Sequence, residues 1–169
     1  MVATARVIKE EHPDAGVVFI GPCASKKLEA MRTSVRSDVD FVITFEELAG
    51  MFEAKSMLLE EMNHREKVDD ATGAGRGYGV AGGVASAIHD CITELYPDVE
   101  VNIEHAEGLS DCKKILMLAK AGKKDGCLIE GMACPGGCVA GAGTNIPIDR
   151  AAKELQKFKL EASRKLPID

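Results

Sequence analysis

The stretch Gly126 to Gly143 reads GCLIEGMACPGGCVAGAG and changes half-way from a strand-like to a turn-like composition. An apolar run leads into Cys134-Pro135-Gly136-Gly137-Cys138, so two thiols lie four residues apart where a predicted strand ends. Proline is favoured at the first position of a helix, which predicts that Cys134 and Cys138 flank a helix N-terminus. The helix dipole stabilises thiolates there, and the thiolate is the form that binds metal. This stretch alone leaves two alternatives open, a metal-binding pair or a tight turn with two packed cysteines.

Composition limits the class of protein. The chain has 169 residues, 46% of them hydrophobic, so we predict one domain over residues 1–169 with a substantial core. The formal net charge is -6 and the basic residues are scattered, which argues against a nucleic-acid partner. No apolar run is long enough for a membrane span, and residues 1–16 carry charges where a signal peptide needs an apolar segment. We therefore expect a cytoplasmic protein with no membrane partner.

The six cysteines divide into two groups. In a reducing compartment, cysteines are more often metal ligands or buried thiols than disulfides. Cys91 and Cys112 each fall on an apolar stripe with helical spacing, so we interpret both as core residues. Cys127 lies in an apolar run and is ambiguous. The remaining thiols are beside glycine or proline at the ends of predicted elements: Cys23, Cys134 and Cys138.

Strand and helix patterns alternate along the chain. We expect strands at 16–20, 39–44, 99–103 and 126–131, and helices at 2–12, 24–35, 45–59, 80–96, 109–121 and 149–164. This order predicts a three-layer α/β fold, with a roughly four-stranded, mostly parallel sheet flanked by helices. Open α/β sheets bind ligands at the carboxyl ends of their strands. If strands 16–20 and 126–131 are parallel neighbours, all three candidate thiols meet at one edge of the sheet.

Two lysines and a glycine-rich run are further candidates for contact with a ligand. Lys26 and Lys27 fall in or near the first turn of a predicted helix, where a cation opposes the dipole and an anionic neighbour would remove the conflict. The alternative is that they are solvated or pair with Glu29 and Glu10, and for Lys27 we favour this alternative. The run at 73–83 resembles a dinucleotide fingerprint only loosely, because no strand precedes it. It favours close approach of the backbone to a ligand or a neighbouring strand.

The metal chemistry of three thiols is either zinc or iron–sulfur. Structural zinc sites favour C-x2-C knuckles, which this sequence lacks. The four histidines have no ligand spacing, and we interpret them as surface or packing residues: His12, His64, His89 and His105. An iron–sulfur cluster is the better fit.

Two long motifs resemble those of a known family. The sequences PCASKKLE at 22–29 and EGMACPGGC at 130–138 are similar to the second and third cluster-binding motifs of iron-only (di-iron) hydrogenases. The segments 39–51 and 73–87 are similar to the family's connecting segments, including YGVAGG at 78–83. The resemblance extends from about Gly16 to Pro147. It implies that the chain is the C-terminal lobe of a hydrogenase catalytic domain.

The resemblance also implies roles for individual residues. Cys23 and Cys134 would bind a four-iron four-sulfur cubane, and Cys138 would bridge it to a di-iron unit that carries carbonyl and cyanide. Lys26 would donate to a cyanide as both a catalytic and a cofactor-binding residue, and Met132 would pack near the di-iron unit. The family reaction is the reversible reduction of protons to dihydrogen.

The family's first motif, a Thr-Ser-Cys-Cys-Pro run, and its ferredoxin-like cysteine modules are absent from this chain. The resemblance therefore implies two partners: an N-terminal lobe of the same protein that carries the remaining ligand, and a ferredoxin-type electron donor. We expect the isolated chain to bind no cofactor and to be inactive. A missing lobe would leave an apolar face uncovered, which favours self-association.

Three departures from the family pattern leave open a divergent or sensory member: Gly21 in place of methionine, Tyr78 in place of phenylalanine and Ala142 in place of a third glycine. The alternative functions are a hydrogenase-like iron–sulfur scaffold without the di-iron unit and a redox or gas sensor without turnover. Lys26 and Met132 favour the hydrogenase.

Overall fold

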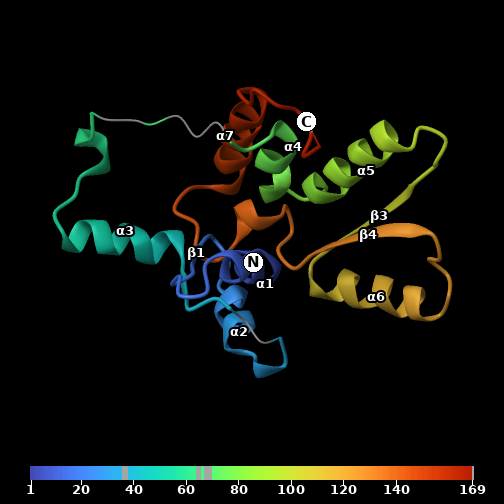
Figure 1. The fold of residues 1–169 in the computed structure, drawn as a ribbon, viewed down its shortest axis with the longest axis horizontal. Helices are drawn as coiled ribbons and strands as arrows, with labels where there is room; N and C mark the ends of the chain where they lie inside the picture. Colours follow the sequence, from blue (N-terminus) through green and yellow to red (C-terminus); the bar gives the residue numbers. More distant parts are fainter. Residues whose placement is uncertain (36–37, 64–65, 67–69, 169) are drawn as a thin grey trace. The chain divides into compact units, whose positions relative to one another are not determined.

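A computed structural model describes residues 1–35, 38–63, 66 and 70–168, and His64 lies outside these ranges. The chain divides into two compact units, which are coloured along the sequence in Figure 1. The first unit comprises Met1–Arg65 and Gly141–Asn145, and the second comprises Glu66–Ala140 and Ile146–Asp169. Each unit contains its own pair of strands, so each is described by itself.

The first unit is built around a short parallel pair of strands. Its elements in order are α1 (Val2–Glu11), β1 (Val18–Ile20), α2 (Ser25–Met31), η1 (Thr33–Val35), β2 (Phe41–Ile43), α3 (Phe45–Ala54) and η2 (Leu59–Glu61). The strands β1 and β2 are parallel, with Val18 opposite Phe41. Asp40 joins this sheet to α1, because its carboxylate accepts the Val17 N–H at 2.7 Å and lies 3.2 Å from the Lys9 ammonium. The hydrogen bond from the Val17 N–H is the largest cause that holds the pKa of Asp40 below its ordinary value, and the contact with Lys9 is the next.

A capping box begins α3, as the Thr44-x-x-Glu47 spacing predicts. The Glu47 N–H donates to Thr44 Oγ1 at 3.2 Å, and the Thr44 N–H donates to Glu47 Oε2 at 2.9 Å. Gly143 packs on this cap: its N–H donates to the Pro22 carbonyl at 3.0 Å, and a Cβ at this position would lie 2.5 Å from Thr44 Cβ. The absence of a side chain at Gly143 therefore allows the segment Gly141–Asn145 to lie against the start of α3.

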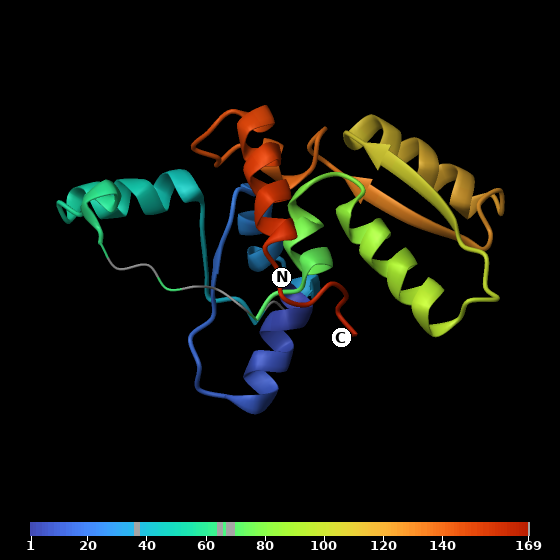
Figure 2. The same cartoon turned by 90° about the horizontal axis from the view of Figure 1, so that it is seen from above.

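The second unit contains α4 (Gly73–Arg76), η3 (Gly77–Gly79), α5 (Gly83–Leu95), β3 (Asn102–Glu107), α6 (Leu109–Lys120), β4 (Cys127–Met132), η4 (Cys138–Ala140) and α7 (Ile148–Leu160). The strands β3 and β4 are parallel, with Asn102 opposite Cys127 and Glu107 opposite Met132. Figures 1 and 2 show α5 and α6 on opposite sides of these two strands, and α6 contacts both strands while α5 contacts β4. This unit therefore has the predicted helix–sheet–helix layers.

A buried arginine joins α4 to α7 in the second unit. Arg76 is 6% exposed, and its guanidinium donates to the Ala71 and Phe158 carbonyls at 3.0 Å each. The same group lies 4.1 Å from the centre of the Phe158 ring. These contacts fix the C-terminal helix on α4, the short helix that begins the glycine-rich run.

The predicted α/β order is confirmed, but the single four-stranded sheet is wrong for the described residues. They form two separate two-stranded parallel sheets, β1–β2 and β3–β4. Each pair of strands is joined by an intervening helix as a local βαβ unit, and a local crossover brings consecutive strands together. Hydrophobic periodicity identifies such strands, but it carries no information about which pairs join into a larger sheet.

Several helices are shorter than their apolar patterns predict. The helix expected at 24–35 is α2 followed by the 3-10 turn η1, and α3 ends at Ala54 rather than near residue 59. Ser56, two residues beyond α3, has φ 53°, a left-handed conformation that an α-helix does not allow. None of the described helices combines the length and the apolar character that a membrane crossing needs.

Loss of the capping box should destabilise the first unit. We expect Thr44→Ala to lower the free energy of unfolding by about 1 kcal/mol, because the Glu47 N–H loses its acceptor. Urea unfolding followed by circular dichroism measures this change. Thr33→Ala is the matched control, because Thr33 is exposed and its replacement should change stability by less than about 0.5 kcal/mol. Equal effects of the two substitutions would contradict the prediction.

The same cap should depend on pH. The pKa of Glu47 is held below its ordinary value of 4.5, mainly by the hydrogen bond from Lys27 and next by the hydrogen bond from the Thr44 N–H. A carboxylate with a lowered folded-state pKa contributes stability that is present above pH 4.5 and is lost as the pH falls through the folded-state pKa. We expect Lys27→Met to raise the pKa of Glu47 toward 4.5, as measured by NMR titration of its side-chain carboxyl carbon. Lys55→Met, a control at the far end of α3, should leave that titration unchanged.

Candidate metal centre

The three predicted thiol ligands lie in different units. Cys23 follows β1 in the first unit, whereas Cys134 and Cys138 follow β4 in the second. Cys23 and Cys134 are half-buried, Cys138 is exposed, and none of the three forms a disulfide. Within either unit of the described chain, no group of three or more cysteine, histidine or carboxylate side chains is placed to hold a metal ion. The premise that strands 16–20 and 126–131 are parallel neighbours is wrong for the described residues, because β1 pairs with β2 and β4 pairs with β3 in separate sheets. The meeting of Cys23 with the other two thiols itself stays a prediction.

Cys134 and Cys138 are separated by a tight turn. The Gly137 N–H donates to the Cys134 carbonyl at 3.0 Å, with Pro135 and Gly136 as the two central residues. Gly136 has φ 90°, and proline followed by a glycine with positive φ is the signature of a type II turn. We name the segment Cys134–Gly137 the cysteine turn.

The predicted α-helix start at Pro135 is wrong. Gly136 and Gly137 have φ 90° and 94°, and right-handed helices require negative φ. Only one turn of 3-10 helix follows, at Cys138–Ala140. A helix dipole therefore does not stabilise these thiolates, and the Pro-Gly pair would have been the correct sequence signal.

The glycine-rich run contacts the cysteine turn directly. The Ala81 N–H donates to the Gly136 carbonyl at 3.1 Å. A Cβ added at Gly137 would lie 2.4 Å from the Ala81 nitrogen and 2.6 Å from the Val80 carbonyl carbon. The backbone approaches closely at this run, as predicted, but its neighbour is the cysteine turn and not a ligand or a strand.

A buried carboxylate on β4 fixes the start of α5. Glu130 is 9% exposed and accepts hydrogen bonds from the Val84 and Ala85 N–H groups at 3.1 Å each, and from the Gly82 N–H. These donors lie at the positive end of the helix dipole, which favours an anion. His105 on β3 lies beside the same carboxylate, with its Nδ1 3.3 Å from Glu130 Oε2. Sequence reasoning did not identify this role, although a lone acidic residue in the apolar run CLIEGM was a signal for it.

A second carboxylate reaches the cysteine turn from β3. The Gly136 N–H donates to Glu107 Oε2 at 2.6 Å. Because the Gly136 carbonyl also accepts from Ala81, this peptide segment is held on both sides. No sequence pattern predicts this contact, since 29 residues separate its partners.

The other predicted site residues have local partners. Lys26 forms an ion pair with Glu29. This pairing is the alternative to an anionic ligand that the sequence left open for Lys26. Lys27 pairs with Glu47 of α3, so it is paired as expected but with a different partner. Met132 is half-buried at the end of β4, and its carbonyl accepts from the Gly108 N–H at 2.8 Å.

Comparison with known proteins decides the family. The family model for the C-terminal domain of the iron-only hydrogenase large subunit matches residues 1–142 of the chain. The chain belongs to this family. The predicted resemblance is therefore confirmed, whereas a divergent or sensory status stays a prediction.

Individual relatives of this hydrogenase chain are longer proteins. It is 28% identical to the periplasmic Fe hydrogenase large subunit of Nitratidesulfovibrio vulgaris over 172 aligned positions. This alignment covers 82% of the chain and 41% of the relative. It is 32% identical to the NADP-reducing hydrogenase subunit HndD of Solidesulfovibrio fructosivorans over 180 aligned positions. This alignment covers 86% of the chain and 30% of that subunit. The chain thus spans less than half the length of these curated relatives.

Solved hydrogenase structures share the fold. The structure of FeFe-hydrogenase HydA1 from Chlamydomonas reinhardtii matches with a TM-score of 0.61 and 22% identity. The match covers 96% of the chain and 57% of that structure. This similarity supports an α/β lobe with parallel strands, as in the family.

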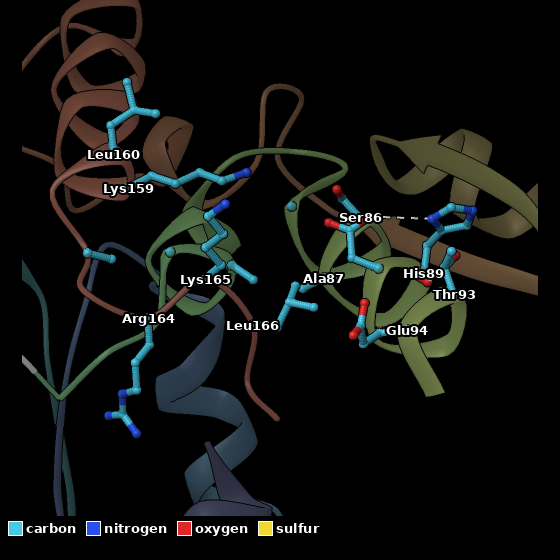
Figure 3. A pocket seen from close by; sticks show the side chains of 15 residues that line it. Ser86, Ala87, His89, Thr93, Glu94, Lys159, Leu160, Arg164, Lys165 and Leu166 are labelled. Carbon is cyan, nitrogen blue, oxygen red and sulfur yellow. Dashed lines mark hydrogen bonds and ion pairs between the residues drawn. The ribbon is translucent and has the colours of Figure 1, made fainter. Parts of the chain in front are cut away.

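The second unit contains a pocket of about 550 Å³. It is lined by α4, α5 and the C-terminal segment, and none of the predicted ligands lines it. Figure 3 shows Lys159 and Lys165 extending into the same side of the pocket, Glu94 on α5 and Arg164 pointing away. Its mixed charge does not indicate one class of ligand.

The two turn glycines should differ in their tolerance of a side chain. Both have positive φ, so alanine at either position should cost about 1–2 kcal/mol in backbone strain. Gly136→Ala meets its nearest atom, Ile148 Cγ2, at an ordinary 3.7 Å, whereas Gly137→Ala overlaps the backbone at Ala81. We therefore expect Gly137→Ala to lower the free energy of unfolding by about 1–3 kcal/mol more than Gly136→Ala does, as measured by urea unfolding. Equal losses for the two variants would show that the glycine-rich run does not hold the turn.

Proposed function

We propose that this chain supplies three cysteine ligands to the cofactor of an iron-only hydrogenase. Cys23 and Cys134 would bind a four-iron four-sulfur cubane, and Cys138 would bridge it to a di-iron unit. Family membership supports the reaction class, the reversible reduction of protons to dihydrogen. The observation that carries the assignment of residues is the cysteine turn, which begins at Cys134, is followed directly by Cys138 and has a backbone fixed by neighbouring segments.

The donor set fits such a cofactor. Thiolates are the usual ligands of iron–sulfur clusters. The Cys138 side chain is exposed, and the half-buried Cys134 begins the cysteine turn that precedes it, so iron can reach this pair without unfolding β4. When bound, the cofactor supplies the redox and dihydrogen chemistry, while the protein supplies position and electrostatics.

Two further residues would act on the di-iron unit. Lys26 would donate a hydrogen bond to a cyanide, which requires it to leave its ion pair with Glu29. That exchange is inexpensive, because an ion pair between partly exposed side chains contributes at most about 1 kcal/mol. Met132 would supply a polarisable apolar contact from the end of β4.

The remaining ligand would come from an N-terminal lobe of the same protein, and electrons from a ferredoxin-type donor. The β1–β2 sheet supports a partner surface, since Val18, Ile20 and Phe41 are 48%, 46% and 67% exposed. We propose that the isolated chain is purified without cofactor, is inactive and self-associates through such apolar surface. Cytoplasmic location is part of the same proposal.

A cluster-carrying scaffold or a sensor without turnover is the alternative function. It leaves the ion pair between Lys26 and Glu29 intact, whereas the hydrogenase requires Lys26 to leave this pair. Infrared bands of bound carbonyl and cyanide, in protein matured together with the N-terminal lobe, support the hydrogenase. A cubane without these bands supports the alternative.

Cluster uptake tests the ligand assignment. We expect the chain to contain no iron as purified and to evolve no dihydrogen with an artificial reductant. Anaerobic treatment with ferric iron, sulfide and excess dithiothreitol, which reduces part of the iron and offers the missing thiolate, should load one four-iron cluster per chain. Cys23→Ser, Cys134→Ser and Cys138→Ser should each abolish or strongly reduce the iron content and the charge-transfer absorption.

Cys91→Ser is the matched control, because Cys91 is a half-buried thiol on α5 that we assign to packing. It should retain the wild-type iron content. Loss of iron in this variant to the same extent, or full retention in all three ligand variants, would overturn the assignment.

A further inference from the structure

Glu107 holds the cysteine turn at its centre. Its carboxylate accepts the Gly136 N–H at 2.6 Å, and Gly136 is two residues from Cys134 and two from Cys138. Glu107 is the last residue of β3, which is fixed along its length by parallel pairing with β4. The contact therefore ties the turn to the end of a strand other than the one from which the turn emerges.

The carboxylate of Glu107 differs in its surroundings from other carboxylates of the second unit. It is solvent-exposed, and in the described part of the chain no lysine, arginine or histidine forms an ion pair with it. Other carboxylates of the same unit are neutralised: Glu104 pairs with Lys124, and Glu154 pairs with Lys157. An uncompensated negative charge thus lies next to the backbone that links the two thiols.

Hydrogen bonding and charge near the ligands are two means by which a protein tunes an iron–sulfur cluster. A backbone N–H that is engaged by a carboxylate is withheld from cluster sulfurs. A nearby negative charge opposes the addition of an electron. Both effects lower the reduction potential of a cluster at this turn.

We propose that Glu107 is a positioning residue for Cys134 and Cys138, and that its charge lowers the reduction potential of the cluster that they bind. The positioning part stands on the contact with Gly136 alone. The part about the potential rests on the proposed function.

Amide exchange of Gly136 tests the positioning role in the metal-free chain. Glu107→Ala removes the acceptor, and we expect exchange of the Gly136 N–H, measured by NMR, to become roughly five- to tenfold faster, as for loss of one hydrogen bond. Glu107→Gln keeps a carbonyl oxygen as acceptor and should restore exchange to within about twofold of the wild-type rate. Glu100→Ala, which removes an exposed carboxylate outside the strands, should have no effect. Equal exchange in Glu107→Ala and Glu100→Ala would overturn the positioning role.

The midpoint potential tests the electrostatic role in the chain loaded with iron and sulfide. We expect Glu107→Gln, which preserves the hydrogen bond and removes the charge, to shift the potential of the cluster upward. Glu107→Ala should shift it further, because the Gly136 N–H is also released. Glu100→Gln controls for the change in net charge. Potentials that are the same in wild type, Glu107→Gln and Glu107→Ala would overturn this role.

The two measurements separate this inference from the proposed function. If the wild-type chain takes up no cluster, the proposed function fails and the proposed effect on the potential fails with it. The exchange rates still decide whether Glu107 positions the turn, since they need no metal.

Discussion

The carboxylate of Glu130 is the group on which the second unit depends. A buried charge is costly unless hydrogen bonds replace its water, and here the N–H groups at the start of α5 do so. These same N–H groups lack partners within the helix, so one side chain satisfies both requirements. As a result β4 and α5 are fixed to each other at the residue where the helix begins.

The contact between Glu130 and the start of α5 also positions the cysteine turn. Glu130 is followed after two residues by the end of β4 at Met132 and then by Cys134, so the turn starts close to the fixed point. On the other side, Gly82 binds Glu130 while its neighbour Ala81 binds the Gly136 carbonyl. The strand, the turn and the glycine-rich run therefore close a ring that is joined at both ends. Cys134 lies within this ring, and Cys138 follows two residues after Gly136.

The sequence predicts what is local in this fold and misses what is long-range. The capping box at Thr44 and the order of strands and helices follow from spacings of a few residues, and they are confirmed. The contacts of Glu130 and Glu107 join residues 25–48 positions apart, and nothing in either neighbourhood specifies its partner. The type II turn was predictable from Pro135-Gly136, but the preference of proline for helix starts led to a different interpretation. The sheet-edge argument for a meeting of Cys23 with the other thiols fails, because β1 and β4 belong to separate sheets, and the family resemblance is what remains in its support.

The rigidity of the cysteine turn has a consequence for the entropy of binding. A flexible Cys-x-x-x-Cys segment must lose the freedom of its backbone when a ligand joins its two thiols, and this loss weakens the affinity. Here the loss has already occurred during folding, because Gly136 is bound through both its N–H and its carbonyl. For the proposed cluster, less of the free energy of thiolate–iron bonding would be offset by the ordering of this backbone, so preorganisation is a property that the fold contributes before any metal arrives.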